Sequence, residues 1–144
     1  MSSQRHFFSD AREAFDFLVS ELGFRVIEPK TDSSLESVRF EKAPLSVEVG
    51  WYKGEVDVGL HVAIDTTILR PYRRKRFGLS EVLVHLQPGI FQTIPRLPES
   101  STTLADARVY LACFAKLMRA HCAEILRGDL KTLEQIVSRD LKQC

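Results

Sequence analysis

Apolar and polar residues alternate along most of the stretch from residue 45 to residue 64. A period of two with one polar face is typical of antiparallel strands that bury one side and expose the other. The interruption at Lys53–Gly54 is a natural two-residue turn, because glycine takes a positive φ without steric cost. The pattern predicts a β-hairpin whose buried side carries Leu45, Val47, Val49, Trp51, Val56, Val58, Leu60, Val62 and Ile64.

Register can be predicted across three strands. Turns at Lys53–Gly54 and at Ala43–Pro44 set apolar residues opposite apolar residues in both strand pairs. A slip of one residue would move every side chain to the wrong face, so this agreement fixes the register. The expected partners are Val49–Val58, Val47–Leu60, Phe40–Val47 and Val38–Val49, with Arg39 opposite Glu48 on the polar face.

Helices are predicted where apolar residues recur at intervals of three or four. The first spans Asp10–Leu22, with Asp10 as its cap and a buried stripe of Phe15, Leu18, Val19 and Leu22. A long helix is expected from Thr102 or Thr103 to Arg127, with a stripe of Ala107, Leu111, Phe114, Met118, Cys122 and Ile125. A short helix at Glu81–Leu86, capped by Ser80, and a last helix capped by Asp129 complete the set.

Two further strands, Phe24–Pro29 and Glu36–Lys42, precede the hairpin, and residues 65–77 are expected to leave the sheet. The predicted fold class is α+β, as a single domain over residues 1–144. It comprises an N-terminal helix, a four-stranded antiparallel β-meander, and C-terminal helices packed on one face of the sheet.

Composition narrows the class of protein without identifying a function. The chain has 144 residues, 44% of them hydrophobic and 27% charged, which fits a globular domain. No apolar run approaches the roughly 18 residues of a transmembrane helix, and acidic residues appear too early for a signal peptide. The three cysteines lack metal-ligand spacing. We therefore expect a cytoplasmic protein that binds no metal or cofactor and no membrane.

No recognised catalytic motif is present, so the protein is not expected to be an enzyme. His61 shares the polar sheet face with Arg39, Glu48 and Asp57, where an acid–base pair is conceivable. The predicted register makes these contacts diagonal and directed to solvent, which favours a solvated polar face. Two glycines on this face, Gly50 and Gly59, indicate a bulge, a simple irregularity, or a close approach by another chain.

Charge is segregated along the chain although the net charge is only +1. Residues 1–69 carry seven basic and twelve acidic residues, whereas residues 70–76, RPYRRKR, carry five basic residues and no acidic one. This segment could bind nucleic-acid phosphates, dock an acidic partner, or cover the acidic sheet of its own chain. Nucleic acid is the second choice, because dedicated binders have a pI above about 9 and this chain has 7.8.

Three stretches, AFDFLVSELGFRVIEP, VRFEKAPLSVEVGWYKGEVDVGLHV and LMRAHCAEILRGDLKTLEQI, resemble a class of small bacterial proteins. Some members of that class are similar to immunity proteins, which neutralise a cognate toxin. The resemblance implies a protein-binding function with a toxin as partner, and the basic segment is not part of it. The expected partner-binding residues are Arg39, Glu48, Glu55, Asp57, His61, Arg70, Tyr72, Arg73, Arg74, Lys75 and Arg76.

Overall fold

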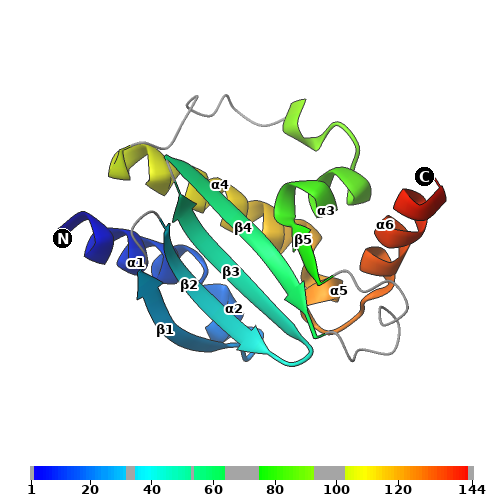
Figure 1. The fold of residues 1–144 in the computed structure, drawn as a ribbon, viewed down its shortest axis with the longest axis horizontal. Coiled ribbons are helices and arrows are strands. Elements are labelled where there is room, and N and C mark those ends of the chain that lie inside the picture. Colours follow the sequence, from blue (N-terminus) through cyan, green and yellow to red (C-terminus); the bar gives the residue numbers. More distant parts are fainter. Residues whose placement is uncertain (1, 32–34, 53, 64–74, 93–102, 143–144) are drawn as a thin grey trace.

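The computed structural model describes residues 2–31, 35–52, 54–63, 75–92 and 103–142. Within these ranges the chain forms one antiparallel sheet with helices on one face, which confirms the α+β class (Figure 1). The strands follow one another in the order β1-β2-β3-β4-β5. Their bounds are β1 Arg25–Thr31, β2 Leu35–Lys42, β3 Leu45–Tyr52, β4 Glu55–Val62 and β5 Arg76–Gly78.

Strands β2 to β4 have the predicted register. Each expected pair is present, including Val49 with Val58, Phe40 with Val47, and Arg39 with Glu48. Gly54 has a φ of +81°, as the turn between β3 and β4 requires. The alternation in sequence places most of the predicted apolar side chains in the core, and those of Val38, Phe40, Val47, Val49 and Leu60 are fully buried. Trp51 and Val56 are only partly buried, and Ile64 lies outside the described residues.

The sheet has a fifth strand where the sequence predicted an exit from the sheet. β5 pairs with β4 through Gly59–Gly78, Leu60–Phe77 and His61–Arg76. A strand of three residues is too short to show an alternating pattern. The fully buried side chain of Phe77 explains why this segment returns to the sheet.

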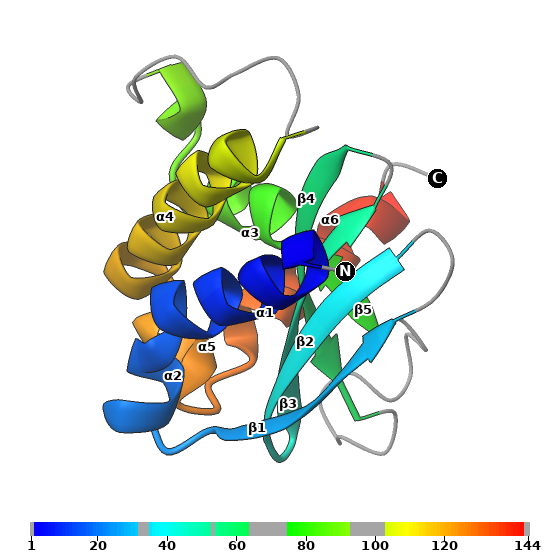
Figure 2. The same cartoon turned by 90° about the vertical axis from the view of Figure 1, so that its left-hand side faces the viewer.

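Helices cover only one face of the sheet, as Figure 2 shows for α1, α3 and α4. The last helix, α6, packs beside α3 beyond β5 (Figure 1). The helices are α1 Ser2–Ala14, α2 Asp16–Ser20, α3 Leu79–Leu86, α4 Leu104–His121, α5 Ala123–Leu126 and α6 Lys131–Lys142, with a 3₁₀ turn at Ile90–Gln92. Among the described residues, the other face of the sheet carries no helix.

The first helix begins earlier than predicted and is broken at Phe15, where ψ is 18°. Its buried stripe consists of Phe7, Ala11, Phe15 and Leu18, whereas Val19 is 38% exposed. Asp10 therefore lies inside α1 and does not cap it; its carboxylate accepts a hydrogen bond from Arg108 Nε at 2.7 Å. This pair ties α1 to α4 on the helix side of the molecule.

The C-terminal helices follow the prediction more closely. Thr103 caps α4, because its Oγ1 accepts a hydrogen bond from the Asp106 N–H at 3.2 Å. Asp129 likewise accepts from the N–H of Lys131 at 3.1 Å. The expected continuous helix to Arg127 is instead interrupted at Cys122, although the whole predicted stripe is buried. α3 begins at Leu79, earlier than expected, with Gly78 in the capping position in place of Ser80.

Candidate functional site

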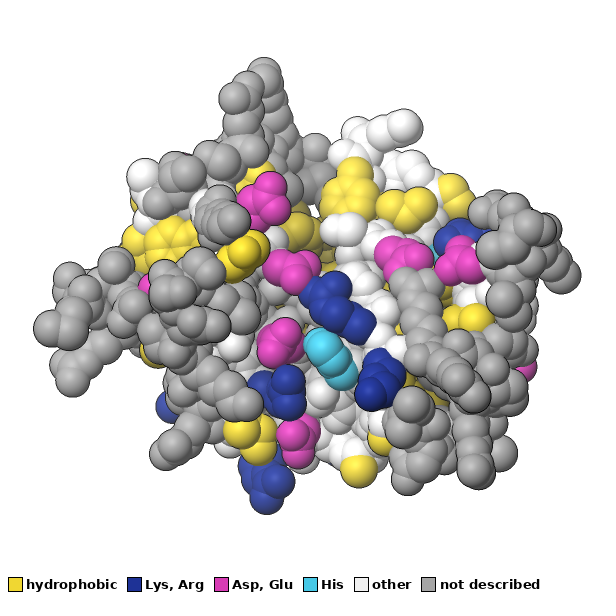
Figure 3. Space-filling model, in the orientation of Figure 1, with side chains coloured by type: hydrophobic (Ala, Val, Ile, Leu, Met, Phe, Trp, Pro, Cys, Tyr) yellow, Lys and Arg dark blue, Asp and Glu magenta, His cyan; other side chains and the backbone are white. Residues whose placement is uncertain are grey.

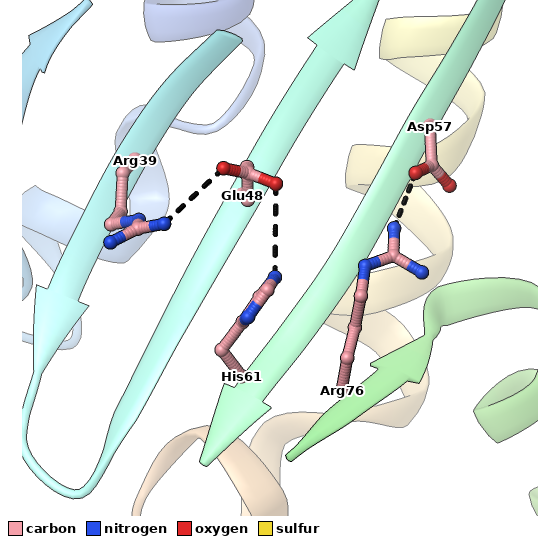
Figure 4. A network of polar contacts seen from close by, with 5 residues as sticks. All are labelled: Arg39, Glu48, Asp57, His61 and Arg76. Carbon is pink, nitrogen blue, oxygen red and sulfur yellow. Dashed lines mark hydrogen bonds and ion pairs between the residues drawn. The ribbon is translucent and has the colours of Figure 1, made fainter. Parts of the chain in front are cut away.

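The face of the sheet that no described helix covers carries five of the residues predicted for partner binding. In Figure 3 this face is turned to the viewer, and acidic and basic side chains surround the single histidine at its centre. The side chains come from consecutive strands, because every second residue of an antiparallel strand points to the same face. Figure 4 shows the central group, Arg39, Glu48, Asp57, His61 and Arg76, which we call the charged face.

Glu48 on β3 lies between the guanidinium of Arg39 and the imidazole of His61. Arg39 Nη2 is 3.4 Å from Glu48 Oε2, and His61 Nε2 is 3.7 Å from Glu48 Oε1 (Figure 4). The contact with His61 is diagonal, as predicted, since the register sets His61 opposite Ser46. The side chains of Glu48 and His61 are only 27% and 29% exposed, so they are less solvated than the sequence suggested.

The environment of His61 lowers the pKa of its imidazole below the ordinary value of 6.5. Burial is the largest cause, because it disfavours the charged ring. Glu48 and Asp57 raise the pKa, while Arg76 and Arg39 lower it. His61 Nε2 is enclosed and has no hydrogen-bond partner in the described structure. The ring is therefore neutral at neutral pH, and the charge of Glu48 is balanced mainly by Arg39.

Arg76 extends the charged face onto β5 and pairs with the carboxylate of Asp57 on β4. Its guanidinium lies across Gly59, where an added Cβ would be 2.8 Å from Arg76 Nη2. A close approach by another chain was one of the alternatives considered for Gly59; the structure shows a close approach by a side chain of the same chain. Arg76 thus covers the acidic sheet of its own chain. This is one of the three interpretations that the sequence left open for the basic segment.

Of the other expected site residues, the structure describes Lys75 and Glu55. Lys75 is exposed, and its carbonyl accepts a hydrogen bond from Val62 N–H at 2.8 Å. Glu55 is exposed at the start of β4. The remaining expected residues, Arg70, Tyr72, Arg73 and Arg74, lie outside the described residues.

One ion pair on the same face was not anticipated from the sequence. Arg25 on β1 lies 3.8 Å from Glu41 on β2, next to the pair of Arg39 and Glu48. The sequence did contain a signal for this pair. Alternation along the strands places Arg25 and Glu41 on the same face of the sheet as Arg39. The polar side of the sheet therefore carries a third compensated pair next to the β1 edge.

A hollow of about 650 Å³ lies on the helix side, away from the charged face, and Glu13, Asp16, Phe17, Lys116 and Arg119 are among the residues that line it. Across it, Arg119 donates to Glu21 at 2.6 Å and lies over the ring of Phe17. Its charges are thus partly satisfied within the chain. The side chains predicted for partner binding do not line this hollow.

Comparison of the chain with protein-family models, curated proteins and solved structures found no match. Within the described part of the chain, no helix combines the length and the apolar character needed to cross a membrane. Functional inference therefore rests on the geometry of the charged face.

Proposed function

We propose that this protein is a non-catalytic binding protein that holds another protein against the charged face of its sheet. The observation that carries the proposal is an ordered set of ion pairs on a sheet face that no described helix covers. Charges held in fixed positions by strands need little reorganisation on binding and select a partner with a complementary pattern. The sequence resemblance supplies the partner class, a toxin that the protein neutralises.

The local geometry favours binding over acid–base catalysis. Glu48 is shared between Arg39 and His61, and its 3.7 Å separation from His61 Nε2 exceeds hydrogen-bond length. Ser46 stands opposite His61 in the register, yet no hydrogen bond joins the two side chains in the described structure. A nucleophile activated by a base would need such a contact.

Nucleic-acid binding receives less support from the same residues. The charge of Arg76 is compensated by Asp57, and Glu41 and Glu48 lie on the same face, where they would repel phosphates. If the basic segment neutralised about five phosphates, log K would fall with log salt with a slope of about −4 to −5. A fluorescence-anisotropy titration that shows such a slope would favour this alternative over a protein partner.

The direct test is co-expression with the product of the neighbouring gene. We expect a tight complex and toxicity of the neighbour only when this chain is absent. Replacing Glu48 and Asp57 together by Lys should weaken the complex at low salt by at least about tenfold, because two fixed charges change sign. The matched control is Glu13→Lys with Asp16→Lys, which makes the same change of charge in the helix-side hollow.

A second pair of substitutions asks whether the basic segment takes part. Arg73→Glu with Arg74→Glu should leave the complex intact if the charged face is the interface. The proposed function would be contradicted if the product of the neighbouring gene were harmless and did not bind. It would also be contradicted if binding were lost in Glu13→Lys with Asp16→Lys but not in Glu48→Lys with Asp57→Lys.

A further inference from the structure

β5 borders only part of β4. The three residues of β5 pair with Gly59, Leu60 and His61, whereas β4 has eight residues. Directly after Gly78 the chain enters α3, where a longer strand would continue along β4 (Figure 1). Among the described residues, the first half of β4 thus has a strand on one side only, namely β3.

The hydrogen-bond pattern identifies the backbone groups on this open edge. Val62 N–H donates to the carbonyl of Lys75, so even-numbered residues of β4 direct their backbone groups towards β5. In an antiparallel ladder this direction alternates with every residue. Val56 and Val58 therefore point their N–H and C=O groups to the same edge, beyond the end of β5.

Of the N–H and C=O groups of Val56 and Val58, the carbonyl of Val58 already accepts a hydrogen bond. Pairing of Gly59 with Gly78 requires the carbonyl of Val58 to accept a bond from the residue after Gly78. Both groups of Val56 remain at the edge, and no described residue pairs with them, whereas the N–H of Val58 faces the position that Leu79 occupies. Unpaired strand edges are the surfaces to which extended peptides add as a further strand.

The side chains around the edge define what kind of strand fits. On the outer side, Glu55 is exposed, and Asp57 is 61% exposed although it pairs with Arg76. On the inner side, Val56 is half-buried and Val58 is buried. An added strand would meet carboxylates with one set of its side chains and apolar surface with the other.

A second copy of this chain is a poor occupant. Antiparallel pairing of two β4 edges about a two-fold axis would set Asp57 opposite Asp57, or Glu55 opposite Asp57. Like charges directly opposite each other destabilise a strand pair. Charge complementarity selects a basic strand instead.

We propose that the open edge of β4 binds an extended segment of the partner protein, with apolar residues alternating with lysine or arginine. This inference rests on the proposed protein-binding function and adds a main-chain contact to it. The segment would form two backbone hydrogen bonds with Val56, just beyond the end of β5. Its basic side chains would lie over Glu55 and Asp57, at the border of the charged face.

The test uses a capped hexapeptide of alternating lysine and valine as the probe. Amide resonances of the ¹⁵N-labelled protein are followed by NMR during the titration. We expect binding with a Kd below about 1 mM, with shifts and slowed hydrogen exchange centred on Val56. The same peptide with glutamate in place of lysine, or with methylated backbone nitrogens, should bind at least about fivefold more weakly. Equal affinity of all three peptides, or no binding at all, would overturn the proposal.

A pair of variants separates the backbone contact from the side-chain contact. Val56→Pro removes an N–H that faces outward and leaves the β3 ladder intact, so it is tolerated at an edge position. It should weaken binding of the lysine peptide by about fivefold or more. The Val56→Thr variant should bind this peptide as tightly as the natural protein does. If Val56→Pro does not fold, the comparison with the methylated peptide still decides the question.

The two proposals fail in different ways. Loss of partner binding in Glu48→Lys with Asp57→Lys, but unchanged binding in Val56→Pro, would uphold the proposed function and remove the edge contact. Peptide binding at the edge together with a neighbouring gene product that neither binds nor harms the cell would uphold the edge contact and remove the toxin partner. Peptide shifts centred on Arg39 and Ser46 would also count against the edge.

Discussion

The guanidinium of Arg76 lies across the backbone of Gly59 on β4, which pairs directly with Glu48 on β3. An alanine Cβ at this position would stand 2.8 Å from Nη2 and 2.9 Å from both Cζ and Nε of Arg76. Real side chains do not approach so closely, so glycine is what allows Arg76 to rest on the sheet and reach Asp57. This relationship connects β5 to the charged face.

Substitution of Gly59 by Ala should therefore displace Arg76 from Asp57. The neighbouring Gly78→Ala is the matched control, because it lies opposite Gly59 and an added Cβ there meets nothing within 4 Å. Alanine at position 78 should raise the free energy of unfolding by up to about 1 kcal/mol. Alanine at position 59 should raise it less or not at all. Urea unfolding of both variants measures the difference. Equal gains would show that Arg76 does not depend on Gly59.

The meander could be predicted from the sequence because two independent signals agreed. Period two fixed the faces, and the turns at Ala43–Pro44 and Lys53–Gly54 fixed the register. The ends of the first helix could not be predicted in the same way. Asp10 is a good capping residue in isolation, but the fully buried Phe7 continues the helix towards the N-terminus. Tertiary burial outweighed the local capping preference.

The sequence predicted which residues of β2, β3 and β4 share the charged face, but not where Arg76 lies. Strand parity placed Arg39, Glu48, Asp57 and His61 on one face, as found. The position of Arg76 depends on β5. This strand has only three residues, so it shows no periodic pattern from which it could be predicted. Strand parity likewise carries no information about the partial burial of His61.

Thr103 offers a test of the helix packed behind the sheet. Its Oγ1 satisfies the Asp106 N–H in the first turn of α4, and Thr103→Ala removes that acceptor. We expect a loss of stability of about 1 kcal/mol, measured by urea unfolding. Thr103→Ser keeps the hydroxyl and should retain most of the stability. An equal loss in both variants would point to the methyl group and not to the cap.

The thiol of Cys122 should be chemically silent in the folded protein. Burial raises its pKa to about 12, and it is fully enclosed at the break between α4 and α5. In a variant with Cys113 and Cys144 replaced by Ser, modification by a thiol reagent at about pH 8 should need unfolding, because only the exposed thiolate reacts. The labelling rate should rise steeply with urea. Rapid labelling without urea would contradict the buried position.

The charged groups around His61 predict opposite shifts of its titration. Glu48 raises the pKa of His61, so Glu48→Gln should lower the midpoint further below 6.5. Arg76 lowers it, so Arg76→Gln should raise the midpoint. The imidazole resonances followed by NMR against pH give both values. Gly59→Ala should resemble Arg76→Gln in this measurement, because it moves the same guanidinium. Shifts in the same direction for Glu48→Gln and Arg76→Gln would contradict the arrangement in Figure 4.

The lowered pKa of His61 also makes folding stability depend on pH. Below pH 6.5 the unfolded chain takes up a proton on this ring before the folded chain does, since the folded pKa lies lower. The contribution of His61 is therefore complete above about pH 6.5 and is lost as the pH falls through the folded value. Urea unfolding of the natural protein at about pH 7.5 and about pH 5 should show this loss, and His61→Gln should show a smaller one. If His61→Gln lost as much stability on acidification as the natural protein, another group would carry the dependence and the neutral, enclosed ring would be the wrong description of His61.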